Sequence, residues 1–251
     1  MNKTDFRSIT KSFFSRPLYY RKGRKQTVDF EKFTPARKFE FANFLKFLDP
    51  QPGDKLIELG SGYGRFVLPL LNLGYDVTAV DISADGLSAL KKEAESNKLD
   101  KKLSVLKSDF HNSTYSEEFN KAFCISTFHL LADSEKERIN ILRNLVKSLK
   151  KRGKLLVVEP NPLNLLYYPF YWFDKEVSWE VEKHFLKSTI WNLKRIFREL
   201  NLKNINTEYI GFLPLRFIDK YKITKNINYV INNLPIIKNI SSFIYISGEK
   251  S

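Results

Sequence analysis

The sequence is poor in cysteine and has no long uninterrupted apolar run. Cys124 is the only cysteine among 251 residues, which excludes an intrachain disulfide and a thiolate metal cluster. The most apolar stretch, residues 163–173, is too short and too often interrupted to cross a bilayer. The basic first residues are not followed by an apolar core and a cleavage site, so we expect no secretory signal. These absences predict a cytoplasmic protein, with peripheral contact at the inner membrane face as an open alternative.

The composition is that of a folded globular chain. Hydrophobic residues make up 43% and charged residues 28% of the sequence, which argues against extended disorder. A chain of this length can bury one large core but not two full-sized ones. We therefore expect one domain with additions.

The positive charge is concentrated at the two ends of the chain. The net charge is +14 overall, with +8 in residues 1–38 (11 basic, 3 acidic) and +8 in residues 183–251 (12 basic, 4 acidic). Residues 39–182 carry 19 basic and 21 acidic residues, a net charge of −2. An anionic partner would meet the flanks, although a lysine-rich solvated surface explains the same pattern.

Apolar strand-like segments alternate with amphipathic helical ones along the middle of the chain. Helices of this length between strands predict right-handed crossovers and a mostly parallel sheet covered on both faces. Strands are expected at 55–59, 76–81, 103–106, 122–126 and 154–159, and helices at 35–48, 66–71, 83–97, 134–149 and 189–200. Two later apolar segments, 205–212 and 240–247, flank a helical-looking stretch at 219–234 and would complete the sheet.

A glycine-rich loop follows the first expected strand. Gly60, Gly62 and Gly64 stand between that strand and the next helix, where backbone N–H groups can approach a ligand closely. A dinucleotide fingerprint would place a small residue at 65, but Arg65 stands there. Glu58, two residues before the first glycine, would repel a pyrophosphate but can organise an amino-acid cation. The loop therefore predicts a nucleotide-like ligand and argues against a dinucleotide.

An acidic residue also ends the second expected strand. Asp81 is placed where a carboxylate can accept hydrogen bonds from both hydroxyls of a ribose. Ile82 can then pack against an adenine. A loop or capping role for Asp81 beside Ser83 remains the alternative.

The acidic glycine loop resembles the first motif of class I S-adenosylmethionine-dependent methyltransferases of the small-molecule or lipid type. This resemblance covers roughly residues 35–160 and implies an α/β fold with a Rossmann-like doubly wound sheet of seven strands, mostly parallel with an antiparallel last strand. It also implies S-adenosylmethionine as the cofactor. The sequence has no cluster of His, Asp and Glu residues at ligand spacing, so we expect no metal site. The positions that match cofactor-binding positions of that family are Glu58, Gly60, Ser61, Gly62, Tyr63, Gly64, Asp81, Ile82, Asp109, Phe110 and Ser126.

The segment after the fourth strand, residues 126–131, resembles the loop that lies between cofactor and substrate in these families. His129 is therefore the candidate general base or substrate hydrogen-bond partner, with a structural role as the alternative. His111 and His184 have no motif around them and are expected at the surface. The loop lacks the Asn/Asp-Pro-Pro pattern of DNA-base and glutamine methyltransferases, and Cys124 lies in an apolar strand, as expected of a core residue.

Two aromatic segments are candidates for the acceptor pocket, one before the first strand and one after the fifth. The first is also basic, which favours an anionic acceptor with an apolar portion, such as a glycolipid or a polyprenyl-linked sugar methylated at oxygen. A packed lid or a membrane-resting surface explains the second segment equally well. The candidate substrate-binding residues are Tyr19, Tyr20, Arg21, Tyr168 and Trp172.

The expected organisation is a basic extension (1–34), a cofactor-binding core (35–160), an aromatic insertion (161–186) and a completion of the sheet (187–251). The extension and the insertion are both expected to act as substrate lids. RNA is the alternative acceptor, since basic flanks with aromatics also bind phosphates and stack bases. A cofactor-binding protein of this fold without turnover is a further alternative. The oligomeric state is left open.

Overall fold

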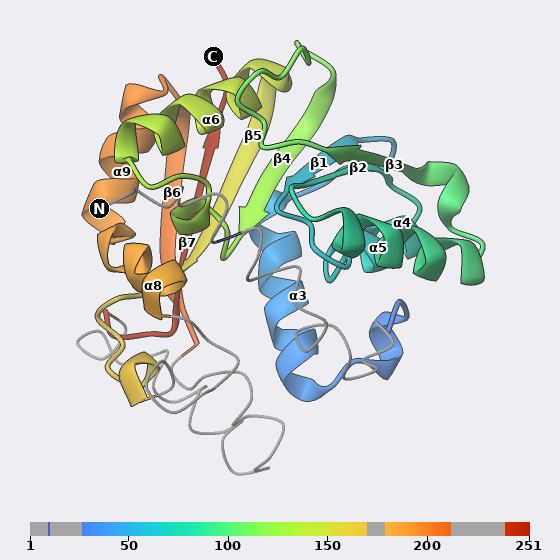
Figure 1. Ribbon diagram of the computed structural model, residues 1–251, viewed down its shortest axis with the longest axis horizontal. Helices are drawn as coiled ribbons and strands as arrows, with labels where there is room; N and C mark the ends of the chain where they lie inside the picture. Colours follow the sequence, from blue (N-terminus) through green and yellow to red (C-terminus); the bar gives the residue numbers. More distant parts are fainter. Residues whose placement is uncertain (1–9, 11–26, 170–178, 212–238) are drawn as a thin grey trace, which may run out of the picture.

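A seven-stranded sheet forms the centre of the protein in the computed structural model, which describes residues 10, 27–169, 179–211 and 239–251 (Figure 1). The strand order is β3-β2-β1-β4-β5-β7-β6. The strands are β1 (Lys55–Leu59), β2 (Asp76–Asp81), β3 (Leu103–Lys107), β4 (Phe119–Ile125), β5 (Leu149–Pro160), β6 (Lys203–Ile210) and β7 (Phe243–Glu249).

Strands β1 to β5 pair in parallel, and β7 runs antiparallel to both β5 and β6. The predicted doubly wound sheet with an antiparallel last strand is therefore confirmed. Strands β2 and β3 lie on one side of β1. Strands β4, β5, β7 and β6 lie on its other side. The order thus reverses between β1 and β4, and in open α/β sheets ligands bind beyond the carboxyl ends of the strands at such a point.

The helices begin where the sequence offers caps. Ser83, Ser134 and Thr189 each accept a backbone N–H from the first turn that follows, and Pro35 occupies the first position of its helix. The helices are α3 (Pro35–Leu48), α4 (Val67–Asn72), α5 (Ala84–Ser96), α6 (Glu135–Ser148), α8 (Trp179–Glu182) and α9 (Ile190–Glu199), with 3-10 turns η1 (Phe30–Lys32), η2 (Asp100–Lys102), η3 (Phe128–Leu130) and η4 (Lys183–Lys187).

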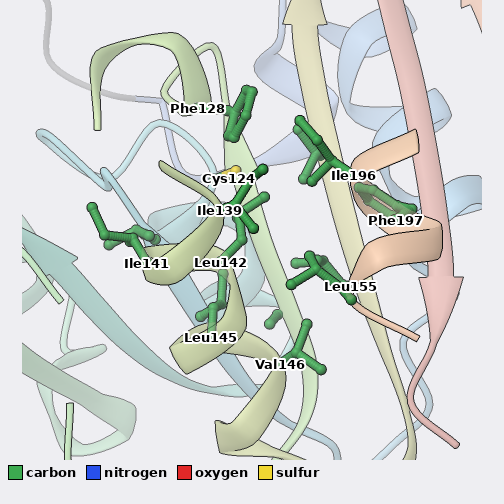
Figure 2. Close-up of a cluster of buried hydrophobic side chains, with 14 of the residues drawn as sticks. Cys124, Phe128, Ile139, Ile141, Leu142, Leu145, Val146, Leu155, Ile196 and Phe197 are labelled. Carbon is green, nitrogen blue, oxygen red and sulfur yellow. The ribbon is translucent and has the colours of Figure 1, made fainter. Parts of the chain in front are cut away.

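Apolar side chains cover both faces of the sheet. One face packs against α6 and α9, where Leu142, Leu145 and Phe197 are fully buried (Figure 2). The other face packs against α3, α4 and α5. Alternate residues of β5 serve the two faces, because neighbouring side chains of a strand point to opposite sides. Cys124 is fully buried in the first cluster, which confirms its expected place in the core.

The strand boundaries differ most at β5. A strand was expected at 154–159, but β5 begins at Leu149, where it pairs with Phe119 ahead of an irregularity in the register. Arg152 takes a positive φ of 62° within it. The helical-looking stretch at 219–234 lies outside the described residues. Among the helices that the structure describes, none combines the length and apolar character that a membrane crossing requires.

Candidate functional site

The glycine loop is fixed to the neighbouring strand by its own backbone. The N–H groups of Gly60 and Ser61 both donate to the carbonyl oxygen of Val80, at 2.8 and 3.1 Å. The Gly64 N–H donates a hydrogen bond to the Ser61 carbonyl oxygen at 2.8 Å. The loop between β1 and α4 is therefore held close to the carboxyl end of β2.

Asp81 reaches this loop with its side chain. Its Oδ2 accepts the Gly62 N–H at 2.7 Å and its Oδ1 accepts the Ser83 N–H at 2.8 Å. Burial raises the pKa of Asp81, against the lowering effect of these backbone hydrogen bonds. The structure thus brings Asp81 and the glycine loop together. The two oxygens of a carboxylate offer about four acceptor positions, so capacity remains for ribose hydroxyls.

Two buried polar groups in the loop region lack partners. Glu58 Oε2 and Ser61 Oγ are buried with no hydrogen bond among the described residues. Burial raises the pKa of Glu58 well above its usual value, Arg65 opposes this rise, and Asp81 adds to it. An unsatisfied buried polar group is costly unless a ligand completes it. A cationic ammonium and ribose hydroxyls supply the missing donors, so these residues fit an amino-acid-bearing nucleoside.

The other predicted cofactor residues lie at the ends of neighbouring strands. Ile82 is half-buried beside Asp81, and Asp109 accepts the His111 N–H at 3.1 Å. Phe110 is fully buried in the core with a φ of 62°, and its ring stacks on Tyr115. Its role as a cover for adenine stays a prediction, and the observed burial is that of a packing residue.

The loop after β4 is organised by a carboxylate from β5. Glu159 is fully buried, and its oxygens accept the N–H groups of Thr127, Phe128 and His129 at 3.0, 3.0 and 3.3 Å. Ser126, just before them, has a φ of 51° and donates its N–H to the Val158 carbonyl. This loop lies against the glycine loop, because the Thr127 side chain fills the space beside the Gly60 Cα.

His129 lies between two carboxylates and is only 1% exposed. Its Nδ1 is 2.6 Å from Glu159 Oε2 and its Nε2 is 3.0 Å from Glu182 Oε2. Burial alone would lower the pKa of His129, but Glu159 and then Glu182 outweigh it and raise the pKa to about 10. Each ring nitrogen thus faces a carboxylate oxygen, and a protonated imidazole can donate to both carboxylates at once.

Sequence reasoning missed Glu159 and Glu182. An acid at the end of a fully apolar strand was the available signal for Glu159, whereas Glu182 had none. His184 was expected at the surface, and this was wrong. It is 8% exposed, and its Nε2 lies 3.1 Å from Asp133 Oδ1, because the turn η4 packs it inward.

The candidate substrate residues are mostly outside the described part of the chain. Tyr19, Tyr20, Arg21 and Trp172 all lie there. Tyr168 is described: its hydroxyl donates to the Pro162 carbonyl at 3.0 Å, and its ring is 6.1 Å from that of Phe185.

Comparisons with known proteins agree with this geometry. Residues 57–157 match a family model described as a methyltransferase domain. A cypemycin N-terminal methyltransferase from Streptomyces sp. is 30% identical over 104 residues, which is 41% of this chain and 41% of that protein. The match thus spans about two fifths of that relative.

Solved structures share the fold. One is a methyltransferase from Thermotoga maritima, described as a possible histamine N-methyltransferase (TM-score 0.59, 18% identity, 96% of this chain and 100% of that chain). Another is phosphoethanolamine N-methyltransferase 2 of Haemonchus contortus in complex with S-adenosylmethionine (TM-score 0.68, 13% identity, 99% of this chain and 60% of that chain). Residues 57–157 therefore match a methyltransferase domain, and the described sheet has the fold of these S-adenosylmethionine-dependent methyltransferases, as the motifs predicted.

Proposed function

We propose that this chain binds S-adenosylmethionine beyond the carboxyl ends of β1, β2 and β4 and transfers its methyl group to a small-molecule or lipid-linked acceptor. The observation that carries the proposal is the pairing of Asp81 with the glycine loop beside the unsatisfied Glu58 and Ser61. Three acidic or hydroxyl groups at this point suit a ribose and an ammonium, whereas a pyrophosphate would be repelled.

The cofactor supplies a methyl group on a sulfonium, which is already an activated leaving group. The protein therefore has mainly to orient the two reactants and exclude water. In our proposal Glu58 faces the ammonium and Asp81 holds the ribose. Ile82, Asp109 and Phe110 surround the adenine, and the remaining loop positions bring their backbone close to the cofactor.

For His129 we propose a positioning role. A doubly paired imidazolium holds the loop after β4 to β5 and to α8, and a general base would need a free ring nitrogen. Glu182 is 17% exposed in its side chain, so the cluster reaches toward solvent through α8. A hydroxyl acceptor would then have to lose its proton to another group or to water.

We propose that the acceptor has an apolar part and an anionic group and is methylated at oxygen. The sequence pattern favours methylation at oxygen, whereas the three similar proteins named above are described as methyltransferases that act at nitrogen. The acceptor-binding residues proposed here are Tyr19, Tyr20, Arg21, Tyr168 and Trp172. Their aromatic rings and single guanidinium favour a ligand with an apolar part and an anionic group.

Substitution of Asp81 by alanine should weaken S-adenosylmethionine binding at least about tenfold, since charge-assisted hydrogen bonds to a ligand are worth about 1.5–3 kcal/mol. Titration calorimetry of wild type and variant measures this. Asp76→Ala at the exposed start of the same strand is the control and should bind like wild type. The proposal would be refuted if wild-type protein bound a nicotinamide nucleotide but showed no binding of S-adenosylmethionine.

Retention of the protein on vesicles or on RNA distinguishes a lipid-linked acceptor from a nucleic-acid acceptor. We expect the protein to be retained by vesicles that contain an anionic polyprenyl phosphate, and not by RNA at moderate salt. Binding to RNA that falls steeply with salt would instead support the RNA alternative, because phosphate contacts release counterions. Retention by neither favours a small soluble acceptor. Cofactor binding without methyl transfer to any acceptor class would favour the non-catalytic alternative.

A further inference from the structure

A charged cluster joins helix α3 to the end of the glycine loop. Glu40 of α3 is only 5% exposed and holds two guanidinium groups. Its Oε2 is 2.8 Å from Arg37 Nη1 and its Oε1 is 2.9 Å from Arg65 Nη2. Arg37 also donates through Nη2 to the carbonyl oxygen of Arg65. Arg65 directly follows Gly64, so the cluster fixes the exit of the loop.

The cluster carries more positive than negative charge. Two guanidinium groups, those of Arg37 and Arg65, face the single carboxylate of Glu40. Burial raises the pKa of Glu58 well above its usual value, and the charges of Arg65 and Arg37 oppose this rise. An acidic ligand group beside the loop would therefore be attracted to this cluster.

Arg65 is the member with donors to spare. Its side chain is 45% exposed, against 17% for Arg37. In the part of the chain that the structure describes, the ion pair with Glu40 uses Nη2, and Nε and Nη1 donate no hydrogen bond. The guanidinium carbon also lies 4.9 Å from the centre of the Phe66 ring. Glu40 and Phe66 thus hold the guanidinium in place before any ligand arrives.

We propose that Arg65, positioned by Glu40, binds the carboxylate of the amino-acid part of S-adenosylmethionine. The inference rests on the proposed function and deepens it. An amino acid presents its ammonium and its carboxylate on one carbon, and the loop presents the unsatisfied Glu58 oxygen and the Arg65 guanidinium around one turn. Guanidinium groups bind carboxylates through two parallel hydrogen bonds, which fixes orientation as well as charge.

The test compares S-adenosylmethionine with its decarboxylated analogue, which lacks only the carboxylate. Calorimetric titration of wild type should show the analogue binding about 10- to 100-fold more weakly, the range expected for a charge-assisted pair. In Arg65→Gln the two ligands should bind within about threefold of each other. Arg143→Gln removes an arginine of similar exposure that is paired with Glu199, and it should keep the wild-type ratio.

Each outcome separates the two proposals. If wild type binds neither ligand, the proposed function fails. If wild type binds both equally, or if Arg65→Gln keeps the full discrimination, cofactor binding stands and the role of Arg65 is overturned. The wild-type comparison needs no variant, so equal binding of the two ligands overturns the role of Arg65 even if Arg65→Gln does not fold. Arg65→Lys, which keeps the charge but not the paired donors, should give an intermediate ratio.

Discussion

Replacing Gly60 by alanine is expected to destabilise the protein by about 2–5 kcal/mol and to weaken S-adenosylmethionine binding at least about tenfold. Gly60 has a φ of +80°, and an added Cβ would lie 2.5 Å from Thr127 Oγ1 and 2.8 Å from Thr127 Cβ. Thr127 cannot move aside easily, because its N–H is bound by Glu159 and its hydroxyl by the Ile125 carbonyl. Thermal unfolding and calorimetry measure the two effects.

Gly53→Ala is the matched control. Gly53 has a φ of +86° but no atom within 4 Å of an added Cβ, so it reports the backbone strain without the collision. It should cost about 1–2 kcal/mol and leave cofactor binding unchanged. Equal losses for the two variants would mean that the close approach of Thr127 to the glycine loop is unimportant.

The second large effect is a pH dependence of stability that originates at His129. Its pKa is about 10 in the folded protein against an ordinary value of 6.5, so the folded state binds the proton more tightly. The stabilisation is therefore complete below about pH 6.5 and is lost as the pH rises toward 10. Wild type should lose on the order of 3–5 kcal/mol of unfolding free energy across this window relative to His129→Gln.

Denaturant unfolding at several pH values between 6 and 10 measures this difference. The groups that face the imidazole are Glu159 from β5 and Glu182 from α8. His111→Gln removes a half-buried histidine outside this cluster and should keep the wild-type profile. Parallel profiles for wild type and His129→Gln would show that the imidazole is not held as a cation.

The order of elements was predictable because local signals agree with the global arrangement. Ser83 precedes an amphipathic segment, and the structure uses it as a cap. The same reasoning placed Asp81 at the end of a strand, next to the glycine loop that it contacts. Residues with a strong local pattern of polarity or a turn requirement were therefore found from the sequence.

The parts that escaped prediction depend on contacts between distant segments. The local sequence identifies Glu159 only as an acid near the end of an apolar strand. The pairing of β4 with β5 brings its carboxylate to the N–H groups of residues 127–129. The Arg37 and Glu40 pair is visible as a helical spacing, but its link to Arg65 requires the packing of α3 on the loop. His184 was misplaced for the same reason, since its burial depends on how η4 folds against the rest.

The dependence of the loop after β4 on Glu159 also sets an order of events during synthesis. The amide of Thr127 leaves the ribosome 32 positions ahead of the carboxylate that holds it. A nascent chain that stops before Glu159 already contains the glycine loop and Asp81. The N–H groups of residues 127–129 then lack the carboxylate that accepts their hydrogen bonds. The contact between the glycine loop and the loop after β4 thus takes its final form only after β5 has joined the sheet.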